Sequence, residues 1–226
     1  KDFSITVIDA IEGRIVDGPL SGSNVFIALN NNSIQNEGEP NSTSDSNGYF
    51  SVENLTESAE GSPKLVSIGG TDTQTGKTLP NLALIADLPS DKSQKVSVTP
   101  ITTVIAAAET AEAKAEVLQA LGISSSLEEL LTTDNWAAAE AGDEAAKELQ
   151  RKNQQVGLII QTADTLTDSA TAMQAAELSK SVAKQLVQIA SNSQTIDLTK
   201  AETINTVLAN AITEVDPNTE ITSETI

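Results

Sequence analysis

The residue pattern of this chain changes once along its length, at Thr99-Pro100. Before this dipeptide, short runs rich in β-branched residues alternate with clusters of turn residues, which is typical of strands. After it, apolar residues recur every three or four positions in Ala-rich segments, which is the spacing of amphipathic helices. The sequence therefore predicts an α+β protein with segregated domains: a seven-stranded β-sandwich over residues 1–98 and an α-helical bundle over residues 99–226.

Turn residues divide the first part into candidate strands. The strongest turn signal is Asn47-Gly48, because this pair accepts the positive φ angles of a tight hairpin. Four aromatic side chains lie in this part and are interpreted as sandwich core, with a carbohydrate-stacking surface as the alternative. The aromatics are Phe3, Phe26, Tyr49 and Phe50, and the predicted strands span residues 5–8, 13–16, 24–29, 48–52, 64–68, 82–87 and 95–98.

The second part begins with an apolar seam from Ile101 to Leu118, which predicts one continuous helix that ends at Leu121-Gly122. A short helix should follow, because Ser126 and Glu129 have the spacing of a capping box. The same spacing of Thr199 and Glu202 predicts the start of the last helix, which Pro217 ends.

Between these helices, residues 134–168 predict one long helix or a helix interrupted near Gly142 or Gly157, since glycine weakens helices. Residues 178–189 carry the apolar stripe of a further helix. Trp136 is expected to be a core or interdomain anchor, with ligand stacking as the alternative.

Composition excludes several classes of function. The chain has no Cys and no His, which removes disulfides, Ser-His and Cys-His nucleophiles and imidazole metal sites. Its formal charge of −19, from 32 acidic and 13 basic residues, disfavours nucleic acid and anionic membranes, because phosphate binding depends on Lys and Arg. No apolar run approaches the about 18 residues that predict a membrane-spanning helix. We therefore expect no enzyme, no nucleic-acid partner and no membrane insertion.

Residues 28–39 resemble a twelve-residue calcium loop. In such a loop, positions 1, 3, 5, 9 and 12 supply oxygens, position 7 supplies a backbone carbonyl and position 6 is glycine. Here position 1 is Ala28 and position 6 is Ser33, so one ligand and the glycine are missing. An Asn-rich strand connection without metal is the alternative, because Asn bonds its own backbone. The predicted calcium ligands are Asn30, Asn32, Ile34, Asn36 and Glu39.

Several segments, taken in order, resemble a known bacterial arrangement. Residues 15–27, the Asn-rich loop ending at Pro40 and residues 43–50 are similar to the prealbumin-like repeats of surface proteins, which include carboxypeptidase regulatory-like and staphylococcal SdrD B-type domains. Residues 69–76 and 98–103, followed by an Ala-rich helical region, are similar to modules of very large secreted adhesin-like proteins of aquatic bacteria.

The resemblance implies a prealbumin-like sandwich, an extracellular or cell-surface location and calcium bound through the Asn-rich loop. It also implies that the partners include neighbouring domains of a larger chain. Lys1 opens the sequence inside a strand-like run, so we interpret the chain as a segment of a longer protein.

These observations predict a non-enzymatic structural or adhesive module of a larger bacterial surface protein. The alternative is a glycan- or peptide-binding module that uses the strand-connecting loops, where sandwiches usually place recognition. An enzyme would need a nucleophile and a base assembled from distant residues, and no pattern in the sequence points to such a pair.

Calcium is expected to bind weakly, with a dissociation constant on the order of 10⁻⁴ to 10⁻³ M, because the loop supplies few formal negative charges. The gain in melting temperature should follow mass action. Glu39→Gln should abolish this gain with little effect in chelator, since Glu39 is the only bidentate carboxylate of the motif. Calorimetry at rising calcium measures both effects. A constant melting temperature up to roughly tenfold above that range would leave a plain strand connection.

Overall fold

The structure is a computed structural model of the 226-residue chain, and it describes residues 10–30, 32–53, 62–91, 93–167, 172–192 and 195–219. Within these residues, strands come first along the chain and helices follow, as the change of pattern at Pro100 predicts. The strands are β1 (Ile11–Ile15), β2 (Leu20–Ser21), β3 (Asn24–Ala28), β4 (Asn41–Thr43), β5 (Tyr49–Val52), β6 (Lys64–Ile68), β7 (Thr71–Asp72), β8 (Ala83–Asp87) and β9 (Val96–Val98). The helices are α1 (Pro100–Ala107), α2 (Ala111–Ala120), α3 (Leu127–Thr132), α4 (Asn135–Glu140), α5 (Glu144–Thr167), α6 (Ala172–Ser191) and α7 (Ala201–Val215).

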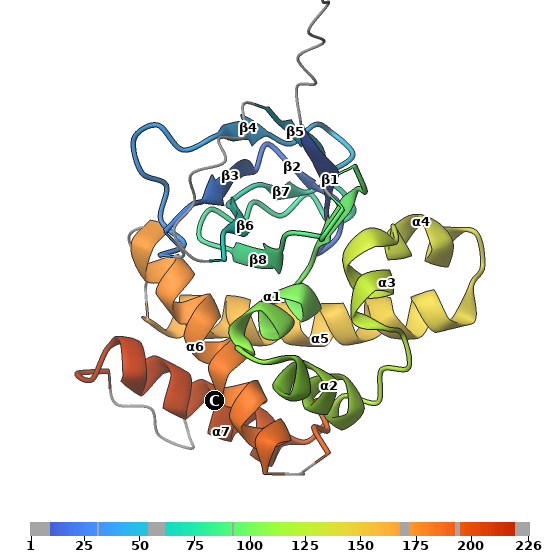
Figure 1. The fold of residues 1–226 in the computed structure, drawn as a ribbon. Helices are drawn as coiled ribbons and strands as arrows, with labels where there is room; N and C mark the ends of the chain where they lie inside the picture. The colour runs from blue at the N-terminus through green and yellow to red at the C-terminus, as the bar shows by residue number, and fades with distance from the viewer. Residues whose placement is uncertain are drawn as a thin grey trace, which may run out of the picture.

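The strands form a layer that lies above the helices in the view of Figure 1. One sheet is antiparallel and has the order β4-β3-β6-β8. A second sheet has the order β5-β1-β9, in which β1 runs antiparallel to β5 and parallel to β9. Strands β2 and β7 pair in a short ladder of their own. The protein is therefore α+β, with mixed as well as antiparallel pairing.

Most of the predicted strands are confirmed, as β1, β3, β5, β6, β8 and β9. The predicted strand at residues 5–8 lies outside the described residues. The sequence pattern does not predict β2, β4 or β7, because each is only two or three residues long. The turn at Asn47-Gly48 is present, and Gly48 has a φ of 81°. However, this turn carries the chain from one sheet to the other, since β4 and β5 belong to different sheets.

Two predicted helix boundaries are wrong. The continuous helix expected from Ile101 to Leu121 is divided, because Ala108 is extended and Thr110 begins α2 as its N-cap, with its hydroxyl 3.1 Å from the Ala113 amide. The last helix begins after Lys200, which makes no side-chain cap hydrogen bond. The predicted cap, Thr199, instead donates its hydroxyl to Asp197 at 2.6 Å. At Thr199, a local turn thus takes the polar group that the predicted helix cap would use.

The division of the first helix also changes which face is buried. Alanine counts as apolar in the three-to-four-residue spacing, but its side chain is too small to determine which face of the helix is buried. The spacing therefore predicts the wrong buried face here. Helix α2 buries Val117 and Ala120, whereas Ala111 and Ala115 of the predicted seam are exposed and Leu118 is half-buried.

Other helix signals are confirmed. Ser126 and Glu129 form the predicted capping box at the start of α3. The break expected near Gly142 or Gly157 occurs at Gly142, whose φ of 100° separates α4 from α5. Gly157 lies inside α5 and is buried.

The larger of two hydrophobic clusters among the described residues passes through strands and helices alike, while the smaller one holds Phe26, Ala28, Val66 and Ile85. The larger cluster includes Ile11 in β1, Leu84 in β8, Ile101 in α1, Ile160 in α5 and Ile212 in α7. Helices α1 and α6 pack against β8, and α3 packs against β9. The two halves therefore bury apolar surface against each other. Segregation into two domains and a prealbumin-like arrangement are not confirmed, and the boundary between residues 98 and 99 stays a prediction.

The aromatic side chains divide between core and surface. Phe26 and Phe50 are buried as predicted, whereas Phe3 lies outside the described residues. The prediction for Tyr49 is wrong, because this side chain is 39% exposed. Side chains alternate along a strand, so Tyr49 points outward when Phe50 points inward. Trp136 in α4 is buried, as expected for an anchor.

Helix α1 covers the open edge of β8. Because β8 is the outermost strand of its sheet, its outward backbone groups need partners. The Ile85 amide donates to the Thr103 hydroxyl at 2.9 Å, and the Thr102 hydroxyl lies 3.1 Å from the Ile85 carbonyl. From α5, the Asn153 side-chain oxygen accepts a hydrogen bond from the Ile101 amide at 2.9 Å. Helix α1 therefore satisfies the sheet edge with side chains and links it to α5.

We expect Thr103→Val to destabilise the protein by about 1–3 kcal/mol, because the shape is kept while the buried Ile85 amide loses its acceptor. Urea unfolding measures the change. The matched control is Thr206→Val on α7. The Thr206 hydroxyl is exposed and donates to the Glu202 carbonyl, so its removal should lower the free energy of unfolding by about 0.5 kcal/mol or less. Equal unfolding midpoints for both variants would contradict the edge-sealing role.

Candidate functional site

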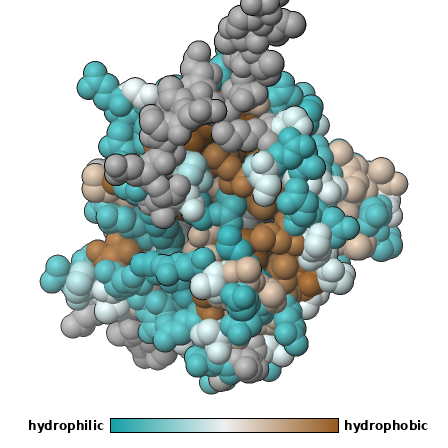
Figure 2. All heavy atoms as spheres, in the orientation of Figure 1, coloured by the Kyte–Doolittle hydropathy of each residue, from teal (hydrophilic) through white to brown (hydrophobic). Residues whose placement is uncertain are grey.

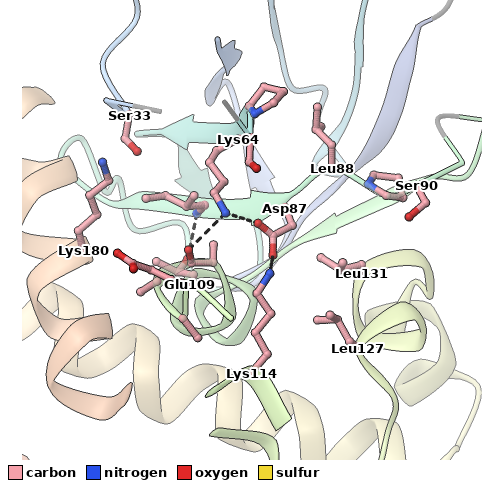
Figure 3. A pocket seen from close by; sticks show the side chains of 18 of the residues that line it. Ser33, Lys64, Asp87, Leu88, Ser90, Glu109, Lys114, Leu127, Leu131 and Lys180 are labelled. Carbon is pink, nitrogen blue, oxygen red and sulfur yellow. Dashed lines mark hydrogen bonds and ion pairs between the residues drawn. The ribbon is translucent and has the colours of Figure 1, made fainter. Parts of the chain in front are cut away.

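A groove of about 830 Å³ lies where the sheet meets the helices. Residues from β6 and β8 line one side, and residues from α1, α2, α3 and α6 line the other (Figure 3). On this face of the molecule, hydrophobic side chains gather beside hydrophilic ones (Figure 2). The volume lies within the roughly 300–1,000 Å³ that ligand pockets occupy. The groove is therefore the candidate binding site.

Two lysines share one carboxylate in the groove. Lys64 and Asp87 are directly opposite each other on β6 and β8, and the Lys64 ammonium pairs with one Asp87 oxygen. The other Asp87 oxygen lies 2.6 Å from the ammonium of Lys114, which comes from α2. The three side chains are only 12%, 15% and 18% exposed for Lys64, Asp87 and Lys114. One negative charge thus faces two positive charges in a largely desolvated place.

Helix α6 adds two more lysines to the wall. Lys180 and Lys184 are four residues apart, so they project from the same face of the helix. Burial lowers the pKa of Lys180, and the positive charges of Lys184 and Lys64 lower it further, against the opposing effect of Glu177. Lys184 is exposed and pairs with Glu214 at 3.0 Å. Positive charge is therefore concentrated at this end of the groove.

The opposite part of the groove is apolar. Leu88 follows β8, while Leu127 and Leu131 come from α3. No aromatic residue lines the groove in the part of the chain that the structure describes. The groove thus combines a cationic wall with an aliphatic one, an arrangement that suits an anionic ligand with apolar groups.

The sequence patterns do not predict the groove. The spacing of Lys180 and Lys184 is a readable signal for a shared helix face. Lys64 and Lys114 join them only because β6 pairs with β8, which packs against α1 and α6, and because α2 packs against α6. A site whose lysines come from three separate elements has no linear spacing to detect.

The predicted calcium ligands mostly bond within their own loop. Asn30 accepts the Asn32 amide at 3.1 Å, and Asn32 accepts the Ile34 amide at 2.8 Å. The side chain of Asn36 donates to the Ile34 carbonyl at 2.9 Å. The loop therefore has the hydrogen bonding of successive Asx turns.

Glu39 closes the same loop as a backbone cap. Its two carboxylate oxygens accept the Leu29 amide at 2.9 Å and the Asn36 amide at 2.8 Å, and the residue is 7% exposed. Ser33, at the glycine position, has a left-handed φ of 59°. The oxygens of Asn30, Asn32, Ile34 and Glu39 already accept hydrogen bonds within the loop, and those of Asn30, Ile34 and Glu39 each keep a further lone pair that a cation could use. Calcium binding stays a prediction.

This geometry changes one expectation for Glu39→Gln. A Gln side chain offers one acceptor and one donor group where two amides now need acceptors. We therefore expect the variant to be about 1–3 kcal/mol less stable in chelator as well, instead of little changed. Urea unfolding in chelator measures this loss. Unchanged stability would mean that the carboxylate does not cap the loop.

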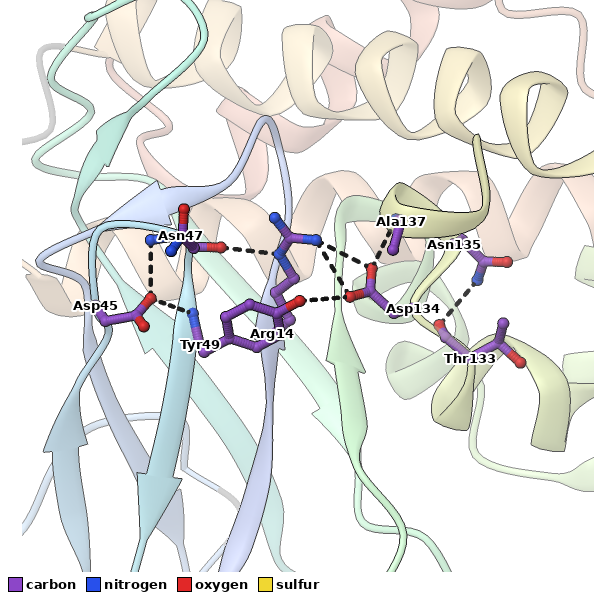
Figure 4. A network of polar contacts seen from close by, with 8 residues as sticks. All are labelled: Arg14, Asp45, Asn47, Tyr49, Thr133, Asp134, Asn135 and Ala137. Atoms are coloured by element: carbon purple, nitrogen blue, oxygen red, sulfur yellow. Dashed lines mark hydrogen bonds and ion pairs between the residues drawn. The ribbon is translucent and has the colours of Figure 1, made fainter. Parts of the chain in front are cut away.

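A second polar network joins the strands to α4 (Figure 4). The Arg14 guanidinium lies 3.2 Å from Asp134, donates to the Asn47 carbonyl at 2.8 Å and stacks 4.7 Å from the centroid of the Tyr49 ring. The Tyr49 hydroxyl also donates to Asp134 at 3.1 Å. Asp134 in turn caps α4 by accepting the Ala137 amide at 3.0 Å. The network fixes the start of α4 against β1 and β5.

A third contact joins the loop after β1 to α5. The Gln161 side chain donates to the buried Asp17 carboxylate at 2.8 Å and accepts from Lys77 at 2.9 Å. A Cβ atom on Gly157 would lie 2.3 Å from the Asp17 carboxylate. This close approach explains the glycine inside α5.

Comparisons with protein-family models, with curated proteins and with solved structures give no match. Among the described residues, no helix has the length and apolarity needed to cross a membrane. In the same residues, no three Asp or Glu side chains gather as a group that could hold a metal ion.

Burial raises the pKa of Asp17 from 3.8 to about 6, against the hydrogen bond from Gln161; nearby Asp72 adds to the rise and Lys77 opposes it. The folded state thus binds this proton more tightly than the unfolded state. The stability that this proton contributes is complete below about pH 4 and is lost as the pH rises to about 6, by up to about 3 kcal/mol.

We expect Asp17→Asn to remove this loss. The variant should match the parent near pH 4 and become more stable than the parent above pH 6, because the amide keeps an acceptor for Gln161 without a buried charge. Urea unfolding across this pH range measures the difference between the two proteins. A difference that does not change with pH would show that Asp17 is not the titrating group.

Proposed function

We propose that this chain is a non-enzymatic structural module of a larger bacterial surface protein, in which strands and helices act together as one stiff spacer. The observation that carries the proposal is the continuous hydrophobic core from β1 to α7. A unit with one core unfolds cooperatively, so it transmits force or position between neighbouring domains without an internal hinge.

Polar contacts between strands and helices support the same role. Asp134 ties α4 to Arg14 in β1, and Gln161 ties α5 to Asp17 after β1. Lys114 of α2 pairs with Asp87 of β8. Each contact restrains a different helix relative to the sheet. Bending between the two halves would break these contacts and leave buried or half-buried polar groups without partners.

The acidic surface supports an extracellular or cell-surface location. A formal charge of −19 causes self-repulsion that cations outside a cell would screen. In this role, the partners are the neighbouring domains of the larger chain and any ligand that the module binds on another surface.

The spacer role predicts one unfolding transition. Trp136, the only tryptophan, reports on α4, while far-ultraviolet circular dichroism reports on all strands and helices. The two signals should have the same urea midpoint. Hydrogen exchange should also give similar opening free energies for central amides of β3 and α5. Separate transitions, or strands that open at much lower free energy than α5, would contradict a single stiff unit.

The location has its own test. An antibody against this chain should label intact cells that produce the parent protein, and labelling should not require permeabilisation. Labelling that appears only after lysis would contradict the cell-surface role.

A second candidate function is a peptide- or glycan-binding module. The sequence places such recognition in the strand-connecting loops, whereas the groove between sheet and helices favours recognition at their junction. Binding there is compatible with a spacer role, because the groove walls belong to the shared core.

A further inference from the structure

We propose that Asn47 is a site of self-modification in the folded protein: its side-chain amide reacts with the main-chain nitrogen of Gly48, ammonia is lost, and Arg14 promotes the reaction. This inference does not depend on the spacer role, because a spacer needs no such reaction. It rests on the free side chain of Asn47, on the glycine that follows it and on the hydrogen bond from Arg14 to the peptide group between them.

The side-chain amide of Asn47 is free to move. Asn47 is exposed, and its hydrogen bonds use main-chain atoms: its amide donates to the Asp45 carboxylate at 2.8 Å, and its carbonyl accepts from Arg14 at 2.8 Å (Figure 4). Within the described ranges, no group bonds the side-chain amide. The turn therefore uses Asn47 without holding the group that would react.

Gly48 offers an unhindered nitrogen for the attack. Asn47 is the only asparagine of the chain that is followed by glycine. Gly48 has a φ of 81°, and a Cβ atom there would lie 2.6 Å from the Ile15 carbonyl oxygen, so a side chain does not fit at this position. The turn thus requires the one residue that also leaves its nitrogen open to the Asn47 side chain.

Arg14 bonds the peptide group that has to lose a proton. The Arg14 side chain is only 10% exposed, and its Nε lies 2.8 Å from the Asn47 carbonyl oxygen. This oxygen shares electrons with the Gly48 nitrogen through the peptide bond. A cation beside the oxygen therefore makes the Gly48 N–H more acidic and stabilises the anion that attacks. Asp134 pairs with a different nitrogen of Arg14, Nη1, so Nε stays with Asn47.

Asp45 opposes this effect in two ways. The Gly48 amide donates to the Asp45 carbonyl at 3.1 Å, and the Asp45 carboxylate adds negative charge nearby. However, a neutral hydrogen bond is roughly half as strong as a bond from a charged group. Asp45 is also exposed, so solvent and salt screen its charge more than that of the buried Arg14. The effect of Arg14 is therefore the larger one.

The reaction needs no partner except water. The Gly48 nitrogen forms a bond to Cγ of Asn47, and the side-chain NH2 leaves as ammonia with the proton from Gly48, so a cyclic imide remains. Water then opens the ring at either carbonyl and gives aspartate or isoaspartate. In isoaspartate, the former main-chain carbonyl becomes a carboxylate, so Arg14 gains an anion where it now bonds a neutral oxygen. Arg14 therefore favours isoaspartate as the product.

The modification would reach α4 through the same network. The new carboxylate competes with Asp134 for Arg14, and Asp134 caps α4. Isoaspartate also lengthens the main chain in the turn between β4 and β5. The contact that fixes the start of α4 against β1 and β5 therefore weakens as the protein ages.

The test follows the folded 226-residue chain over time at mildly alkaline pH, below its melting temperature. Mass spectrometry of digested samples detects replacement of the Asn47 side-chain NH2 by OH, and electron-transfer fragmentation separates isoaspartate from aspartate. A synthetic peptide of residues 43–52 gives the rate without the fold. Asn32 is the internal control, because its side-chain oxygen accepts the Ile34 amide and serine follows it. We expect conversion of Asn47, mainly to isoaspartate, while Asn32 stays unchanged.

Variants separate promotion by Arg14 from simple opening of the turn. Arg14→Gln should slow conversion about tenfold, because loss of a hydrogen bond from a charged group corresponds to about one order of magnitude in rate. Asp134→Asn is the matched control: it weakens the same network but leaves the bond from Arg14 to Asn47, so the rate should not fall. Circular dichroism melting checks that the variants fold. Arg14→Lys, which keeps the charge but lacks Nε, should also slow conversion and replaces a misfolded Arg14→Gln.

Three results would overturn the proposal. The first is an unchanged Asn47 in the folded chain after the synthetic peptide has converted. The second is conversion in the Arg14 variants as fast as in the parent or faster, which would mean that Arg14 only holds the turn closed. The third is equal slowing by Arg14→Gln and Asp134→Asn. None of these results would alter the single unfolding transition expected of a spacer, so failure of the two proposals can be told apart.

Discussion

The hydrogen bonds between α1 and the edge of β8 are the contact on which the rest of this structure depends. An unpaired sheet edge must be covered, and here the cover is a helix that begins immediately after the last strand. Thr102 and Thr103 supply the polar partners, while Ile101 and Val104 of the same turn enter the core. Once α1 lies against the edge, α5 and α6 can pack around it and close one core over both halves.

Several of the 13 basic residues of this acidic chain lie where strands meet helices. Arg14 pairs with Asp134, Lys77 bonds Gln161, and Lys114 pairs with Asp87. A protein with a charge of −19 gains from placing positive charge between its layers, because each such residue offsets repulsion across the junction. In the groove, Lys64 and Lys114 hold Asp87 between them, and a binding role there would use side chains that also stabilise the fold.

The candidate site shows how far linear spacing can be interpreted. The alternation of Asn30, Asn32, Ile34 and Asn36 fits calcium ligands, yet the same alternation fits successive turns that bond their own backbone. Because the motif lacks one ligand and the glycine, it cannot distinguish a calcium loop from a series of such turns. The groove has the reverse problem, since its lysines come from β6, α2 and α6 and no spacing relates them.

By itself, the sequence determined the order of strands and helices, the capping box at Ser126 and the break at Gly142, because these depend on a few neighbouring residues. Only the tertiary structure decided that Tyr49 faces outward to Arg14, that α2 buries Val117 and that the two halves share a core. The physical reason is that the spacing of apolar residues indicates which positions are buried. Which element covers them depends on contacts between residues far apart in the chain. The same holds for the groove, whose lysines come together only when β6, α2 and α6 have packed.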